Sequence, residues 1–70
     1  ELDTRMLIIK LGWVPFIDIT GLHSLEEIIQ SCHKQQVRVA LIGANQRVKD
    51  RLEKAGIIQL VGEQNILTSL

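Results

Sequence analysis

The sequence predicts a small α/β fold in which parallel strands alternate with helices. Two short apolar runs of β-forming residues, 6–11 and 37–42, each stop before a glycine, as buried parallel strands often do. Between them, apolar residues recur with the spacing of an amphipathic helix. Strand, helix and strand in this order imply a right-handed crossover between parallel strands. Two long strands cannot form a stable parallel sheet alone, so we expect something further to pair with them.

The first run and the segment after it are expected to be buried. Residues 6–11 have the continuous apolar character of a strand covered on both faces. The only tryptophan and phenylalanine, Trp13 and Phe16, then flank Pro15, which interrupts regular helix. We expect Phe16 and Ile17 to bring the chain to the carboxyl end of the sheet, with Phe16 buried. For Trp13, burial and an exposed role as an anchor for a partner both stay open.

The first helix is predicted to start at Leu22 and to end near Gln35. His23 and Glu27 are one turn apart and predict a modest surface pair. Cys32 is expected as a small core residue, because no zinc-ligand spacing is present, and no metal site is predicted. The predicted inward set is Leu22, Leu25, Ile28, Ile29 and Cys32, and the outward set is His23, Glu26, Glu27, Gln30 and His33.

Asparagine and glycine mark the ends of the second predicted helix. Asn45 is placed as an N-cap ahead of residues 46–55, whose Val48 and Leu52 face inward. Gly56 stands where a left-handed C-terminal cap is expected. Acidic residues are interleaved with a cluster of basic ones along this helix, which favours a solvated face over a binding patch. The basic residues are Arg47, Lys49, Arg51 and Lys54, and the acidic ones are Asp50 and Glu53.

The last part of the chain predicts two short elements. Residues 57–61 are apolar and predict a short strand or a packed turn. Gly62 and Asn65 then introduce residues 66–70, which predict the first turn of a further helix.

Composition excludes several classes of protein. Seventy residues provide one small domain. The net charge is zero, whereas a general nucleic-acid binder needs a basic stripe, so no nucleic-acid partner is predicted. A single cysteine cannot form an internal disulfide and fits a reducing compartment. The sequence shows neither a signal peptide nor an apolar run long enough to span a bilayer, so we expect the chain itself to be soluble.

The sequence offers no catalytic grouping. It has no recognisable Ser–His–acid arrangement, and the adjacent residues Glu26 and Glu27 point in different directions rather than forming an acid/base pair. The turn after residues 37–42 lacks the glycines and lysine of a nucleotide-binding loop. We therefore predict a binding or regulatory module rather than an enzyme, with no cofactor.

The strongest functional signal is the turn formed by Asp18, Ile19, Thr20 and Gly21, which runs into Leu22. It joins a strand to a helix N-terminus, where ligands and partners engage open α/β sheets and where free N–H groups favour an anion. Asp18 and Thr20 can also accept hydrogen bonds from those N–H groups, and Gly21 permits a tight turn. From these residues alone, helix capping is favoured over a dedicated binding site.

Residues 14–29, VPFIDITGLHSLEEII, resemble the signature region of the STAS domain at the cytoplasmic end of SulP-type sulfate and anion transporters. The similarity continues through CHKQQVRVALIG, VKDRLEKAGII and VGEQNI, and so covers nearly the whole chain from about Met6. It implies a STAS-like sheet with crossover helices, from which the N-terminal strands and first helix are absent. Residues 1–70 would then be a partial STAS domain, from about the third strand to the start of the final helix.

The resemblance also implies a function. The chain would be a non-catalytic regulatory and interaction domain on the cytoplasmic face of the membrane, the inner membrane in a bacterium. The turn would contact the transporter's transmembrane domain, a second protomer, a cytosolic protein, or a small anion or nucleotide. Asp18 would hold the turn, Gly21 would let the backbone approach, and Thr20 would cap or bind.

The alternative is a free-standing anti-sigma factor antagonist, which has the same fold and binds an anti-sigma factor through the same loop. In those proteins the loop reads Asp-Ser-Ser/Thr-Gly, and the serine after the aspartate is phosphorylated. Ile19 stands at that position here and cannot accept phosphate, which favours the transporter branch. Thr20 matches the next hydroxyl position, but phosphorylation there is not what the motif predicts.

Overall fold

A parallel sheet and the helices beside it make up the described part of the chain, residues 5–68 of a computed structural model. In chain order the elements are β1 (Arg5–Lys10), α1 (Ile19–Lys34), β2 (Val37–Ile42), α2 (Gln46–Lys54), α3 (Ile57–Val61), the 3-10 helix η1 (Glu63–Asn65) and β3 (Ile66–Leu67). The strand order within this range is β1-β2-β3, with both pairs parallel. The predicted α/β fold with parallel strands is therefore confirmed.

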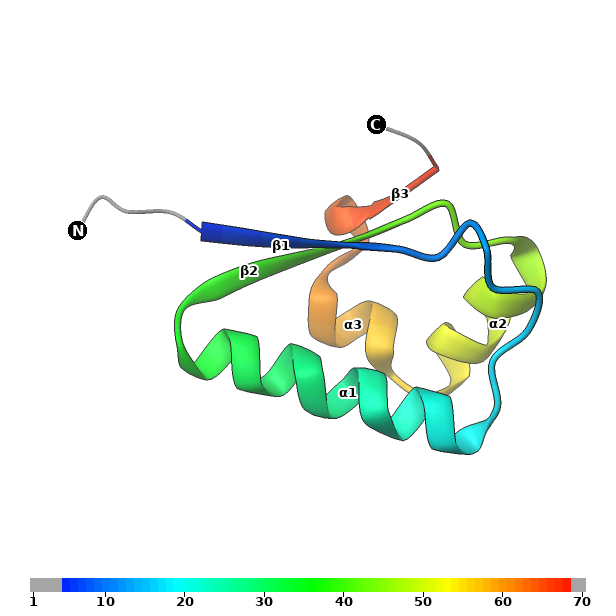
Figure 1. The fold of residues 1–70 in the computed structure, drawn as a ribbon, viewed down its shortest axis with the longest axis horizontal. Helices are drawn as coiled ribbons and strands as arrows, with labels where there is room; N and C mark the ends of the chain where they lie inside the picture. Colours follow the sequence, from blue (N-terminus) through cyan, green and yellow to red (C-terminus); the bar gives the residue numbers. More distant parts are fainter. Residues whose placement is uncertain (1–4, 69–70) are drawn as a thin grey trace.

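The helices lie on one side of the strands (Figure 1). The strand order steps in a single direction across the sheet, so right-handed crossovers place α1 and α2 against the same face. Because β1 and β2 are parallel, they end at the same edge of the sheet. The loops that lead into α1 and α2 therefore both begin at this carboxyl edge.

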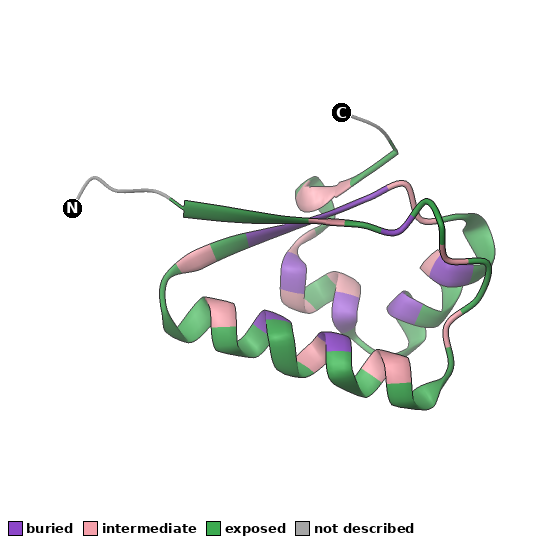
Figure 2. Cartoon of the chain, viewed as in Figure 1, coloured by how far each residue is buried: buried purple, intermediate pink, exposed green. Residues whose placement is uncertain are grey.

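An aliphatic core fills the space between the sheet and the helices (Figure 2). Ile29 of α1, Leu41 of β2 and Leu52 of α2 are completely buried. Full burial of an aliphatic side chain of this size stabilises the fold by about 1.5–3 kcal/mol. The other core members are Leu11, Leu25, Val39, Val48, Ile57 and Val61.

The predicted inward face of α1 is confirmed with one exception. Leu25 and Ile29 are buried, and Leu22 and Cys32 are partly buried and pack against the core. Ile28 is wrongly predicted, because 47% of its surface is exposed. It precedes Ile29 by about 100° of helix rotation, which turns it toward the edge of the buried stripe.

The strand β1 is exposed, which contradicts the prediction that residues 6–11 are covered on both faces. Within the described residues β1 is an edge strand with one neighbour, β2, and the helices cover one face of the sheet. Met6, Leu7 and Ile8 consequently keep 38–45% of their surface exposed. Only Leu11, just beyond the strand, is buried, and its N–H donates to the carbonyl of Ile42 at 2.8 Å.

Both predictions for the last part of the chain are wrong. Residues 57–61 form a short helix, α3, in which the N–H of Leu60 donates to the carbonyl of Gly56 at 3.1 Å. Ile66 and Leu67 form β3 rather than a helical turn, and the carbonyl of Leu67 accepts from the N–H of Gly43 at 2.9 Å. Residues 69–70 of the predicted helical turn lie outside the described range.

Gly56 provides a test of the predicted left-handed cap, which the structure confirms with a φ of 79°. We expect Gly56→Ala to lower the free energy of unfolding by about 1–2 kcal/mol, because a left-handed backbone strains any residue with a Cβ. Urea unfolding followed by far-UV circular dichroism measures the change.

Gly12→Ala is the matched control. A Cβ at either glycine has no neighbouring atom within 4 Å, but Gly12 does not have a positive φ. Equal stability of the two alanine variants would show that the backbone at Gly56 is not strained by a side chain.

Candidate functional site

Asp18 is the N-cap of α1, which confirms the capping interpretation of this residue. Its Oδ1 accepts a hydrogen bond of 2.8 Å from the N–H of Gly21, and its backbone is extended. The helix therefore begins at Ile19, three residues before the predicted start. Ile19, Thr20 and Gly21 consequently form its first turn, so Thr20 is a helical residue and not the cap.

Gly21 has a packing role. A Cβ at this position would lie 3.0 Å from Cγ1 of Ile17 and 3.3 Å from Oδ1 of Asp18. Ile17 is partly buried and packs against the core, so the missing side chain makes room for both the core contact and the cap. The family resemblance implied that Gly21 lets the backbone approach, and contacts with Ile17 and Asp18 within this chain already favour a glycine there.

Asn45 ties the two loops at the carboxyl edge together. Its Oδ1 accepts from the N–H of Val48 at 2.8 Å, which confirms it as the N-cap of α2. Its amide nitrogen Nδ2 also donates to the carbonyl oxygens of Val14 and Pro15, at 3.3 Å and 3.2 Å. One side chain thus starts α2 and fixes the loop that leads into α1.

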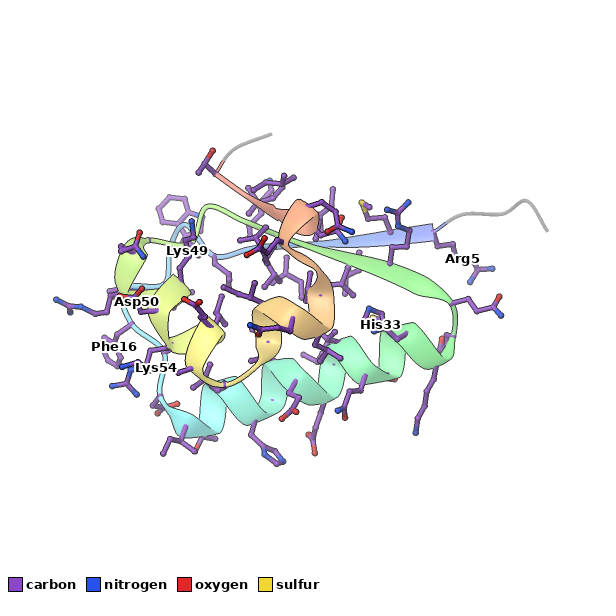
Figure 3. The ribbon with its side chains drawn as sticks, turned by 180° about the vertical axis from the view of Figure 1, so that it is seen from behind. Arg5, Phe16, His33, Lys49, Asp50 and Lys54 are labelled. Atoms are coloured by element: carbon purple, nitrogen blue, oxygen red, sulfur yellow. The ribbon has the colours of Figure 1, made fainter. Side chains whose placement is uncertain are left out.

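This loop carries both aromatic side chains on its outside. Val14 and Ile17 pack against the core, and the residues between them turn outward. Phe16 is 63% exposed and Trp13 is 90% exposed. The predicted burial of Phe16 is wrong, because the anchoring of its neighbours leaves its ring directed away from the core, as its place beside α2 in Figure 3 illustrates.

An open groove of about 600 Å³ lies between the start of α1 and α2. Of the predicted site residues, Asp18, Ile19 and Thr20 line it, whereas Gly21 and Leu22 do not. Leu22 lines a smaller neighbouring hollow of about 370 Å³ with Arg51, Lys54 and Ala55. The full lining of the larger groove is Phe16, Ile17, Asp18, Ile19, Thr20, Arg47 and Arg51.

Arg47 and Arg51 are the site residues that the sequence interpretation missed. Three of the four basic residues share one side of the helix, because residues 47, 51 and 54 fall within about 60° of one another, whereas Lys49 lies on the far side and Asp50 is about 60° from Arg47. Gln46 Nε2 donates to Oδ1 of Asp50 at 2.8 Å. Helical spacing could have revealed the basic stripe, but not that it faces Asp18.

Three further sequence expectations concern a surface pair, metal ligands and membrane-spanning helices. His23 Nε2 lies 3.4 Å from Oε2 of Glu27, and both side chains are largely exposed, so the predicted surface pair is confirmed. Within residues 5–68 no cluster of three potential metal ligands occurs. In the same range, none of the helices is both long and apolar enough to cross a bilayer.

Removing the cap of α1 is expected to weaken the fold. Asp18→Ala deletes the acceptor for the N–H of Gly21 and should cost about 1 kcal/mol of unfolding free energy, whereas Asp18→Asn keeps an acceptor and should cost less. Thermal unfolding of both variants measures the difference. If Asp18→Ala unfolds like the unchanged chain, Asp18 serves binding rather than stability.

The two functions of Asn45 can be separated. Asn45→Asp keeps a good N-cap but removes the amide that donates to the carbonyls of Val14 and Pro15. We expect it to cost about 1–3 kcal/mol of unfolding free energy and to shift the backbone amide resonances of residues 13–17. Asn45→Ala, which loses both functions, should cost more. An Asn45→Asp variant with unchanged stability and resonances would show that the loop is held by other contacts.

The comparisons with known proteins identify the family. A sequence profile for the STAS domain matches residues 1–69. Sulfate transporter 1.1 of Arabidopsis thaliana is 32% identical over 66 residues, and High affinity sulfate transporter 1 of Stylosanthes hamata is 30% identical over 68 residues. These matches cover 94% and 97% of this chain but 10% of each relative. The chain thus spans about a tenth of the length of these curated relatives.

Solved structures agree with this assignment over the whole chain. The SulP transporter STAS domain from Vibrio cholerae superposes with a TM-score of 0.91 at 51% identity, and this chain covers 55% of it. A sulfate transporter family protein from Wolinella succinogenes superposes with a TM-score of 0.89 at 31% identity, with 57% of that chain covered. The chain therefore belongs to the STAS domain family, with the fold of the STAS domains found in SulP-type transporters.

Proposed function

We propose that this chain is a non-catalytic regulatory and interaction domain of a SulP-type sulfate or anion transporter, held at the cytoplasmic face of the membrane. The groove beside the Asp18 turn is the observation that carries the proposal. It combines exposed apolar side chains with cations from α2, which suits contact with a partner. The described residues that line it offer no nucleophile paired with a base, which supports a binding role over a catalytic one.

The partners that we propose for this groove follow from the type of parent protein. The transmembrane domain of the same transporter is the first, and a second protomer or a cytosolic protein is the next. A small anion or nucleotide at the start of α1 is a further candidate, since Arg47 and Arg51 supply positive charge there. Asp18 shapes the turn, and Ile19 and Thr20 present its surface.

We further propose that the sheet is completed by strands outside residues 1–70. The exposed apolar strand β1 supports this, because Met6, Leu7 and Ile8 sit at a free sheet edge in the described structure. Such an edge is normally paired or covered in a folded domain. On this view the 70 residues are the C-terminal part of a STAS domain, from about its third strand onward.

The free-standing anti-sigma factor antagonist is the less favoured reading. Ile19 is 77% exposed and begins α1, so the position that the phosphorylated serine takes in those antagonists is accessible here but holds no hydroxyl. Thr20 is also exposed. Phosphate recovered on Thr20 after incubation with a kinase of the anti-sigma factor type would favour that alternative.

The proposed regulatory role is tested by sulfate uptake of the parent transporter. Ile19→Glu places a carboxylate in the first turn of α1, where the helix dipole tolerates a negative charge, and it changes the surface of the groove. We expect the rate of sulfate uptake to change while the amount of transporter in the membrane does not. Gln30→Glu, an equal charge change at an exposed position in the middle of α1, is the control and should leave uptake unaltered. Uptake that is identical for both variants and the unchanged protein would contradict a regulatory role of this surface.

A further inference from the structure

Two guanidinium groups of α2 line the groove and have no partner among the described residues. Arg47 and Arg51 are one helical turn apart, which places their Cβ atoms about 5–6 Å from each other. Within residues 5–68 neither guanidinium forms a hydrogen bond or an ion pair. Asp50, the nearest acidic residue in the sequence, accepts from Gln46 instead. Both arginines are therefore available to an external carboxylate or phosphate.

The opposite wall of the groove carries two exposed apolar side chains, Phe16 and Ile19, beside Asp18 and Thr20. Phe16 is 63% exposed and Ile19 is 77% exposed, and neither belongs to the core cluster. Phe16 directly follows the carbonyls of Val14 and Pro15 that Asn45 holds, and Ile19 directly follows the helix cap. Because the backbone beside them is already held, little backbone freedom is lost there when a partner binds.

A bilayer surface fits this arrangement poorly. The chain has a net charge of zero, Asp18 lies in the groove itself, and Asp50 is only about 60° of helix rotation from Arg47. A flat anionic surface would meet these carboxylates together with the cations, whereas membrane attraction grows with the excess of positive charge. A small inorganic anion would engage the arginines but would leave Phe16 and Ile19 exposed.

We propose that this groove binds a helical protein segment that carries two carboxylates one turn apart and a large apolar side chain on the same face. The two carboxylates would pair with Arg47 and Arg51, whose spacing they match. The apolar side chain would cover Phe16 and Ile19 between the two helices. This inference rests on the proposed function in one respect, namely that the groove is a contact surface, and it adds the chemistry of the partner.

The test uses the full 70-residue chain and a synthetic helical peptide with two glutamates one turn apart and a leucine beside them. Binding is measured by titration of the backbone amide resonances, which also shows whether each variant is folded. We expect shifts at the start of α1 and along α2. Arg47→Gln and Arg51→Gln should each weaken binding by about tenfold, through loss of a charge-assisted pair. Phe16→Ala should also weaken it by about tenfold, as an interface aromatic does.

Matched controls separate this groove from general charge attraction. Arg38→Gln removes one positive charge from an exposed position near the other end of β2 and should leave binding unchanged. A peptide with glutamine in place of both glutamates should bind at least about tenfold more weakly.

Four results would overturn the proposal. Two of them are equally tight binding of the glutamine peptide and unchanged binding by the two arginine variants. The third is displacement of the peptide by inorganic sulfate at a concentration below that of the peptide. The fourth is binding of the chain to phosphatidylglycerol vesicles without binding to the peptide. If any of these occurs while Ile19→Glu still alters sulfate uptake, the acidic partner is rejected and the regulatory role stands. If the peptide binds as expected but Ile19→Glu leaves uptake unaltered, the partner chemistry stands and the regulatory role is rejected.

Discussion

The side chain of Asn45 is the constraint on which the geometry of the carboxyl edge depends. A single primary amide has both an acceptor and donors, and here each is used: the oxygen starts α2, and the nitrogen holds the loop after β1. Apart from this bond, the loop and the helix meet through the shared core, against which Val14 and Ile17 pack. The bond fixes the loop that leads to Phe16 and Asp18 directly to the start of α2. Serine or aspartate would cap the helix equally well but could not donate to both carbonyls.

The features of the groove follow from this one junction. Anchoring Val14 and Ile17 to the core while Asn45 holds the intervening carbonyls forces Phe16 outward. The same anchoring places Asp18 where its carboxylate can cap α1. The groove therefore forms because two strand-to-helix loops are fixed side by side. Its walls belong to segments 30 residues apart in the sequence, as the Asn45–Pro15 contact shows.

Features set by neighbouring residues could be predicted from the sequence, and features set by distant ones could not. Helix caps depend on contacts within a few residues, so they can be predicted from the sequence, as they were for Asp18, Asn45 and Gly56. The parallel alternation of strands and helices and the burial of Leu52 follow from periodicity in the same way. β3 depends on pairing with β2, and the exposure of Phe16 depends on Asn45, so local patterns gave the wrong answer for both. Family resemblance supplied the fold family, because it draws on the whole chain at once.

Among the described residues β1 is an edge strand, which bears on the behaviour of the chain in solution. Exposed strand edges with apolar side chains associate with other strands, and charge repulsion is the usual protection against this. Here the formal net charge is zero and the isoelectric point is about 7.0, so copies of the chain repel one another least near neutral pH. A segment placed against this edge would therefore protect the chain from association. Colloidal stability of the 70 residues on their own improves as the pH moves away from neutrality, up to the point at which added charge begins to unfold them.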